Sequence, residues 1–443
     1  MSSTSNEQEE IREFEKIMRT LPTVLDSLPD DHADLVGGYR LIAIWCIRFN
    51  QFEKAIEFLE LLVKRQEEVT ANLEIASLFQ NIGNIARNHK QNELSIKAHY
   101  NAIDIYNSNT VEDNRAHIAE NLMHIVGNYN ELDQYENALA VHEKILEIKK
   151  SLFSSKHIEI AYQYKNIGRT YEYSCNFKEA IEAYDKAIEI TSACEPLDYE
   201  LISILQIFIG DSYFESGNFK KALNYYQSSL YYIQKKQNSS LLDIAEVFCD
   251  IAETFGVLGE FENLIEYLNK AILVYEELNH TLDCSLLIGN LKSIIGTVYM
   301  EYLKNEDQDN CFKKAIDYYR EFLEIYQTFP YEFDVDRYFN LYQRRESSKD
   351  YVLRLVKLTT NPGYYDMLWR THGHLSQAFD EINQYKDALF HGLISLKIKN
   401  EQLDPNHPSI LASHTKVANY YAELGDTTSC LFHIEIEIGR AHV

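Results

Sequence analysis

A sequence unit recurs about every 42 residues along most of this 443-residue chain. It is aligned on one small residue near the start of a predicted helix, here named the anchor, as in "FKEAIEAY" at Phe177–Tyr184, where Ala180 is the anchor. The anchors are Ala55, Ser95, Ala138, Ala180, Ala222, Leu264, Ala315, Ala388 and Cys430. Successive separations are 40, 43, 42, 42, 42, 51, 73 and 42 residues, so the chain is predicted to be a repeat protein.

The residues around each anchor recur with fixed spacing. An aromatic residue usually stands three positions before it and another nine positions before it, and at six of the nine anchors a glycine or alanine stands twelve positions before it. Around Ala180 these are Phe177, Tyr171 and Gly168. Separations of three, four and seven place side chains on one face of a helix, and small residues let two helices approach closely. Each unit is therefore predicted to be a helix pair, and the chain to be all-α.

Together, the period and these positions resemble the tetratricopeptide repeat family in its 42-residue form, known from kinesin light chains. The stretches "SKHIEIA" at Ser155–Ala161 and "DPNHPSILA" at Asp404–Ala412 resemble the connector of that type. The resemblance covers about Ala33 to Ile436, although Asp133 stands where the hairpin turn usually has glycine. It implies a right-handed superhelical solenoid of about nine antiparallel helix pairs, whose first helices line a concave groove.

The same pattern divides the chain into segments. Residues 1–32 are an N-terminal segment with a predicted helix at Glu7–Leu21, which would cap the first repeat or, as a less favoured alternative, dock on a partner. Residues 33–326 hold repeats 1–7, and residues 365–436 hold repeats 8–9. Between them, residues 327–364 are a degenerate repeat or an insert, with the degenerate repeat favoured.

The last seven residues, 437–443, read "EIGRAHV" and interrupt the repeat pattern. They resemble the in-frame translation of a common sequencing adapter. We therefore expect a non-native tail, with a natural protein that continues differently after Ile436.

Composition narrows the classes of partner and compartment. The formal net charge of -26 argues against binding to nucleic acid or to an anionic membrane surface. Seven scattered cysteines without a C-x-x-C pair are typical of a reducing compartment. The polar N-terminus is no targeting signal, and the longest apolar run, Leu41–Ile47, is too short to span a membrane. A cytoplasmic protein is predicted.

The sequence holds no recognisable catalytic motif. Glycine-rich phosphate loops, H-E-x-x-H and G-x-S-x-G are all absent, so no cofactor is predicted. His372 and His374 form the one close histidine pair, and alternate residues of a helix point in different directions, so no metal site is predicted. His99 and His142 occupy repeat-framework positions and are expected to pack.

By the resemblance, residues beside the small residue of each first helix should point into the groove. Asparagine side chains there can donate to and accept from a peptide backbone at once. The candidate peptide-binding residues are Gln80, Asn81, Asn84, Arg87, Lys165, Asn166 and Arg169. Matching positions of later repeats are acidic: Asp211, Glu215, Asp250, Glu253, Glu301, Asp380 and Glu381. The competing interpretation is that these are only the solvated sides of helices.

The favoured function is a non-catalytic interaction scaffold or adaptor that binds a peptide or a helix of a partner protein in the groove. A kinesin light chain-like cargo adaptor is one form of it, although no heptad segment precedes the repeats. The alternative is the regulatory arm of a larger enzyme, such as a glycosyltransferase, an ADP-ribosyltransferase or an NTPase, whose catalytic domain follows Ile436. Self-association through an exposed end repeat is a further hypothesis.

Overall fold

The computed structural model describes nine stretches of the chain: residues 5–28, 34–65, 72–109, 113–236, 240–278, 282–303, 307–327, 364–405 and 407–441. Within them the chain forms nineteen α-helices and no strand, which confirms the all-α prediction. The chain divides into two compact units, Met1–Asp198 and Tyr199–Val443. None of the described helices is long and apolar enough to cross a membrane.

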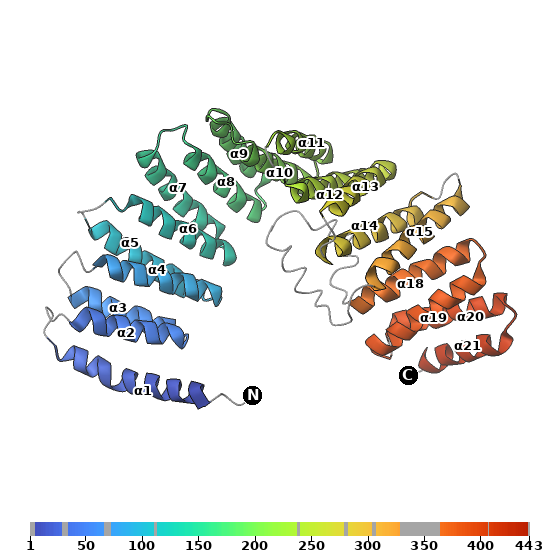
Figure 1. The fold of residues 1–443 in the computed structure, drawn as a ribbon, viewed down its shortest axis with the longest axis horizontal. Coiled ribbons are helices and arrows are strands. Elements are labelled where there is room, and N and C mark those ends of the chain that lie inside the picture. Colours follow the sequence, from blue (N-terminus) through green and yellow to red (C-terminus); the bar gives the residue numbers. More distant parts are fainter. Residues whose placement is uncertain are drawn as a thin grey trace. The chain divides into compact units, whose positions relative to one another are not determined.

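The first unit holds α1 and four helix pairs, stacked in chain order from blue to green in Figure 1. The helices are α1 Ser5–Asp26, α2 Asp34–Arg48, α3 Phe52–Arg65, α4 Asn72–Asn88, α5 Asn92–Ser108, α6 Arg115–Glu131, α7 Tyr135–Leu152, α8 Ile158–Tyr173 and α9 Phe177–Ser192.

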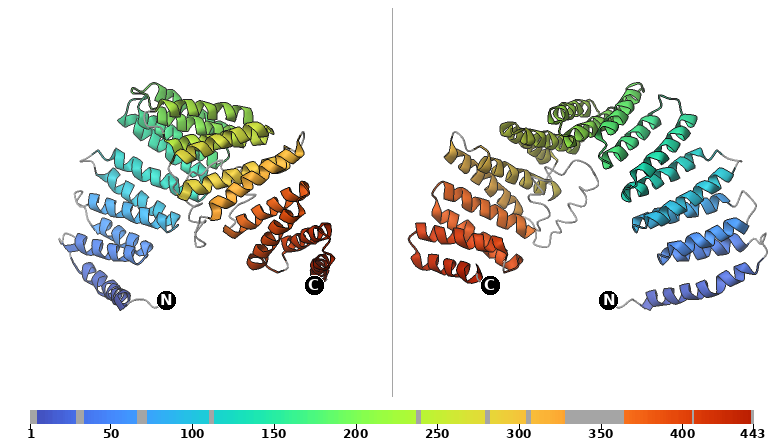
Figure 2. Two further views of the ribbon diagram at one scale, coloured as in Figure 1. Left: turned by 45° about the vertical axis from the view of Figure 1, so that its right-hand side comes forward. Right: turned by 180° about the vertical axis from the view of Figure 1, so that it is seen from behind.

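The second unit holds five helix pairs, which lie side by side in chain order in both views of Figure 2. The helices are α10 Tyr199–Glu215, α11 Phe219–Lys235, α12 Leu241–Leu258, α13 Phe261–Glu277, α14 Leu282–Glu301, α15 Gln308–Gln327, α18 Tyr364–Glu381, α19 Tyr385–Gln402, α20 Pro408–Glu423 and α21 Thr427–Ala441.

The pairs follow the predicted repeats. Within each unit, a first helix packs along the second helix of its own pair, and each pair contacts the next. The nine pairs among the described residues agree with the predicted number, and α1 packs on α2. Residues 328–363, and with them the predicted degenerate repeat or insert, lie outside the described residues. α15 nevertheless contacts α18 directly, so the stacking order continues across that segment.

A ring packed on a glycine sets how closely two helices of a pair approach. Tyr184 of α9 is fully buried, and its ring lies on Gly168 of α8. Tyr226 of α11 lies on Gly210 of α10 in the same way. The partners are 16 residues apart in both pairs, four positions after the anchor and twelve before it. The small residues of the sequence pattern therefore leave room for the ring of the second helix.

In eight of the nine described pairs, the turn places a residue in the left-handed backbone region five positions before the anchor. In the remaining pair, α14 and α15, that position is Asn310, which lies inside α15. Glycine holds that position three times, with φ of 77° to 79°, at Gly217, Gly259 and Gly425. Other residues adopt φ of 56° to 59° there: Asn50, Lys90, Asp133, Cys175 and Asn383. The left-handed conformation costs a non-glycine residue roughly 1–2 kcal/mol, so packing of the flanking helices imposes it. Asp133 thus departs from the family's glycine without changing the turn.

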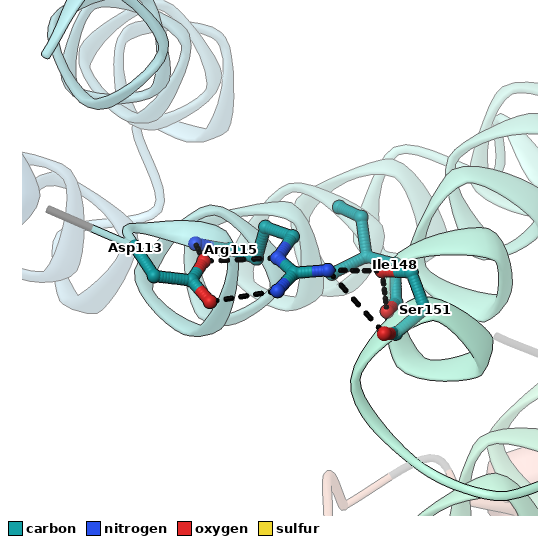
Figure 3. Close-up of polar contacts among 4 residues, drawn as sticks. All are labelled: Asp113, Arg115, Ile148 and Ser151. Carbon is teal, nitrogen blue, oxygen red and sulfur yellow. Dashed lines mark hydrogen bonds and ion pairs between the residues drawn. The ribbon is translucent and has the colours of Figure 1, made fainter. Parts of the chain in front are cut away.

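Arg115 ties a connection between two pairs to the end of a helix (Figure 3). Its guanidinium donates to both carboxylate oxygens of Asp113, at 2.9 and 2.7 Å, and these hydrogen bonds hold the pKa of Asp113 at about 2. It also donates to Ser151, at 3.0 Å to Oγ and 3.3 Å to the carbonyl oxygen, at the end of α7. The Ser151 hydroxyl in turn donates to the Ile148 carbonyl at 2.7 Å. The Ser151 carbonyl lies in the last turn of α7, where no backbone N–H of the helix is left to bond it, and the Arg115 guanidinium satisfies it instead.

The two connectors that resemble the kinesin light chain type begin helices with a histidine. His157 Nδ1 accepts a hydrogen bond from the backbone N–H of Glu159 at the start of α8, and His407 Nδ1 accepts one from Ser409 at the start of α20, both at 3.2 Å. Each imidazole therefore acts as an N-cap, satisfying one of the backbone donors that a helix start leaves free.

We predict that Gly168→Ala destabilises the first unit by about 1–3 kcal/mol, the usual cost of overpacking. The added methyl group would lie 2.7 Å from Tyr184 Cδ1 and Cζ, and the fully buried ring cannot move aside. Gly37→Ala in α2 is the control, because its methyl group meets no atom within 4 Å and alanine favours a helix by about 0.5–1 kcal/mol. Urea unfolding measures both. Equal effects of the two substitutions would contradict the ring contact.

Candidate partner-binding face

The seven predicted groove residues lie on α4 and α8, the first helices of two pairs in the first unit. We name the surface formed by α4, α8 and the intervening α6 the first-helix face. Asn81 is exposed, and the other six side chains are half-buried: Gln80, Asn84, Arg87, Lys165, Asn166 and Arg169. The structure therefore places all seven side chains within reach of solvent, on α4 and α8, with the first helix α6 between them.

Arg87 of α4 joins its repeat to the next one. Its Nε and Nη2 atoms lie 2.9 and 2.6 Å from Glu131 Oε1 at the end of α6. The guanidinium also covers Gly127 of α6, where a methyl group would lie 2.6 Å from Nη1. The sequence analysis singled out neither Glu131 nor Gly127 as a partner of this arginine. Arg87 is thus part of the structure of the face as well as a candidate ligand-binding residue.

Lys165 and Arg169 put two cations one helical turn apart on α8, each beside a tyrosine. Lys165 Nζ lies 5.2 Å from the ring centre of Tyr162, and Arg169 donates to the Tyr173 hydroxyl at 2.8 Å. Burial, and then the neighbouring charge of Arg169, lower the pKa of Lys165. The two tyrosines hold the cations in place and cover their aliphatic stems.

The amides of the face separate into two groups. Asn81, Asn84 and Asn166 make no side-chain hydrogen bond within the described part of the chain. Asn130 of α6, by contrast, donates to Thr170 Oγ1 of α8 at 3.2 Å and so links two first helices. A carboxamide without a partner at a partly exposed surface can bond both the N–H and the C=O of a peptide backbone.

A network of buried polar side chains lies beneath this face. His99 of α5 packs on Gly83, and its Nδ1 is 2.8 Å from Asn121 Oδ1 of α6. His142 of α7 lies 3.1 Å from Thr170 Oγ1 and 2.9 Å from Gln163 Nε2, both on α8. The two histidines are buried, which confirms that they are packing residues. Their hydrogen bonds cross from one pair to the next and fix the order in which pairs stack.

Two of the seven acidic positions of the second unit do not face an open groove. Asp211 of α10 is buried and accepts a hydrogen bond from the Tyr226 hydroxyl at 2.8 Å, and Glu253 of α12 is buried as well. Burial and the nearby carboxylates, Asp211 first, raise the pKa of Tyr226. Asp211 therefore serves the packing of its own helix pair.

His372 and His374 turn to different neighbours. His372 Nδ1 lies 2.8 Å from His391 Nδ1, whereas the ring of His374 packs against Tyr319, with centres 5.4 Å apart. The first arrangement recurs 42 residues later between His414 and His433, at 2.7 Å. No group of three or more His, Cys, Asp or Glu side chains is placed to hold a metal ion among the residues that the structure describes.

Comparisons with known proteins find one matching family model and several similar solved structures. Residues 117–193 match the family model described as tetratricopeptide repeat. A search of curated proteins finds no match. Similar solved structures include BtubC from P. vanneervenii, at 12% identity and a TM-score of 0.41, covering 63% of this chain and 94% of that one. Apo RapI is similar at 14% identity and a TM-score of 0.43, covering 73% of this chain and 77% of that one. The kinesin light chain TPR-like repeats from Podosopora anserina are similar at 14% identity and a TM-score of 0.40, covering 49% of this chain and 100% of that one.

We predict that acid destabilises the chain in a window set by its buried histidines. Burial lowers the pKa of His99, His142, His372, His374 and His391 to about 4. In the unfolded chain these side chains titrate near pH 6.5, so between about pH 6.5 and 4 the unfolded state binds more protons than the native state. Stability is therefore full above about pH 6.5 and falls as the pH drops through this window.

Thermal unfolding followed by circular dichroism from neutral pH to pH 4.5 measures this loss. His374→Phe keeps a ring against Tyr319 and removes one titrating group, so its melting temperature should depend less steeply on pH. A variant with the slope of the wild type would show that His374 is not a source of the acid sensitivity.

Proposed function

Because this chain is a tetratricopeptide repeat protein, we propose that it is a non-catalytic interaction scaffold or adaptor. Its partner is a peptide or a helix of another protein, and the binding site is the first-helix face. Gln80, Asn81, Asn84, Lys165, Asn166 and Arg169 contact the partner. Arg87, which is bound to Glu131, keeps α4 and α6 in register beneath it.

One observation carries this proposal: the three asparagines of α4 and α8 lack hydrogen-bond partners within the described part of the chain, whereas several neighbouring polar side chains are engaged. Arg87 is paired, Asn130 is bonded, and the two cations of α8 lie against tyrosines. Arg87, Asn130 and Arg169 thus bond other residues of the repeats, while the amides of the three asparagines are open to a peptide backbone. This division is what a preformed peptide site requires.

A non-catalytic role is supported by the contacts of the histidines whose pKa values are lowered by burial. The histidines with strongly lowered pKa values contact other repeat residues: His99 bonds Asn121, His142 bonds Thr170, and His372 bonds His391. Perturbed pKa values mark catalytic sites only where the groups converge on a cleft, and here they serve packing.

We also propose a cytoplasmic location. All seven cysteines lie in the described residues and all are free thiols, with Cys46 and Cys284 buried. Burial raises the pKa of the Cys46 thiol to about 11, so it stays protonated and unreactive. Unpaired thiols in this number are typical of a reducing compartment.

The test is selection of a displayed random peptide library on the immobilised chain, followed by titration of the selected peptides. The double variant Asn81→Ala, Asn166→Ala removes two open amides and no internal hydrogen bond. Two lost hydrogen bonds of about 0.5–1.5 kcal/mol each should weaken binding roughly tenfold or more.

The matched control is Asn107→Ala, Asn400→Ala, on the second helices α5 and α19, where both side chains are exposed and make no hydrogen bond within the described part of the chain. We expect this variant to bind like the wild type. If the control loses affinity and the first variant keeps it, the partner binds elsewhere, and the assignment to the first-helix face is wrong. Substitution of Arg87 is avoided because it would also break the contact with Glu131.

A further inference from the structure

One helix of the second unit has a charge pattern unlike any other. α11, Phe219–Lys235, contains no aspartate or glutamate, and it is the only one of the nineteen described helices of which this is true. It carries three lysines, and a fourth, Lys236, follows it directly. In a chain of net charge -26 this local excess of positive charge requires a reason.

The outer face of α11 is continuous and polar. Its buried side is formed by Ala222, Tyr226, Ser229 and Ile233. On the opposite side, residues three or four positions apart follow one another along the helix and are exposed: Lys220, Asn224, Gln227, Tyr231, Gln234 and Lys235. Lys221 flanks this row and is exposed as well. We name this surface the α11 face.

Three lysines of the α11 face lack a carboxylate partner. Lys220, Lys221 and Lys235 form no ion pair within the described part of the chain. Lys221 lies 4.8 Å from the ring centre of Tyr213, and Lys235 lies 5.3 Å from that of Tyr231. Lys236 is different, because its Nζ is 2.8 Å from Glu200 Oε2 of α10. The net positive charge of the face is therefore open to a ligand.

Comparison with the preceding repeat shows which acidic residues α11 lacks. The positions of Asn224, Gln227 and Tyr231 are held 42 residues earlier, on α9, by Glu182, Asp185 and Glu189. There Lys178 pairs with Glu182 one turn away, at 3.9 Å. On α11 the equivalent Lys220 faces Asn224 instead. The α11 face thus keeps the lysine of the repeat but not the three acids that neutralise it.

The location of the lysines is unfavourable for the helix itself. Lys220 and Lys221 stand in the first turn of α11, at the positive end of the helix dipole, where acidic residues are stabilising. The neighbouring second helices α9 and α13 have Glu179 and Glu262 in the first turn. An unfavourable arrangement that helix stability does not explain points to a binding role.

We propose that the α11 face is a second binding surface, one that takes an acidic segment of a partner protein. It is distinct from the first-helix face and extends the proposed function. The lysines at its two ends, Lys220 and Lys235, lie about 22 Å apart, from 1.5 Å per residue. An acidic helix lying along α11, or an extended acidic strand of about seven residues, spans that distance. The exposed Tyr231 between them, 56% accessible, packs on the apolar part of the segment.

A protein segment fits this surface better than nucleic acid does. The lysines occupy one face of a single helix, whereas the chain as a whole is strongly acidic and would repel a long polyanion. A short ligand with spaced carboxylates meets only the lysines and the tyrosine.

The test uses the full chain and a fluorescein-labelled glutamate/alanine peptide of about fifteen residues, the helical length that spans the face. Fluorescence anisotropy at low ionic strength measures binding. The variant Lys220→Gln, Lys221→Gln, Lys235→Gln should bind roughly tenfold more weakly than the wild type, which corresponds to about 1.4 kcal/mol. The control Lys313→Gln, Lys386→Gln, Lys397→Gln removes three exposed lysines elsewhere in the second unit and should bind normally.

A second variant separates lost binding from lost folding. Asn224→Glu, Gln227→Asp restores two acids of the α9 pattern, so it should retain or increase the helix stability measured by circular dichroism and still lose the peptide. A glutamine/alanine peptide should not bind the wild type. Equal binding of the acidic peptide to all variants, or no binding to any, would overturn the proposal. So would a single-stranded DNA oligonucleotide that binds more tightly than the peptide and depends on the same lysines.

Discussion

The contact of a ring on a glycine underlies the rest of this structure. Because Tyr184 lies on the bare backbone of Gly168, α8 and α9 approach closely enough to share one interior. The same contact joins Gly83 to His99 and Gly296 to Tyr319, and in α18 and α19 the roles are exchanged, with Gly392 facing Ser376. A pair of such short helices cannot bury its apolar faces alone, so pairs must stack. The period of the sequence is the period of this contact.

Most of the fold could be predicted because that contact requires particular residue types at fixed positions of the sequence. Small and aromatic residues at fixed distances from the anchors give the helix pairs, and the left-handed residue recurs five positions before the anchor whether it is glycine or Cys175. The long-range polar contacts could not be predicted. Arg87 and Glu131 are 44 residues apart, and no local pattern selects that pair from the many charged residues of the chain. The acidic residue Asp211 was assigned to a groove, but the Tyr226 hydroxyl engages it.

The candidate sites centre on side chains that make no hydrogen bond or ion pair to other described residues of the repeats. On the first-helix face, Asn81 and Asn166 are such positions, because the neighbouring Arg87 and Asn130 already hold the helices together. On α11, Lys220 and Lys235 are such positions, because the acids that accompany them in the preceding repeat are absent. In both places these side chains make no hydrogen bond or ion pair within the described part of the chain. A repeat scaffold can therefore carry two binding surfaces without altering its core.

Hydrogen–deuterium exchange measured by mass spectrometry, with and without a saturating peptide selected on the chain, tests the central claim most directly. We expect slower exchange in α4 and α8, whose side chains form the first-helix face, and unchanged exchange in the second helices α5 and α9. Backbone amides of first helices gain protection when a ligand bonds across them, since local opening becomes rarer. Protection confined to second helices, with α4 and α8 exchanging as in the free chain, would contradict the account.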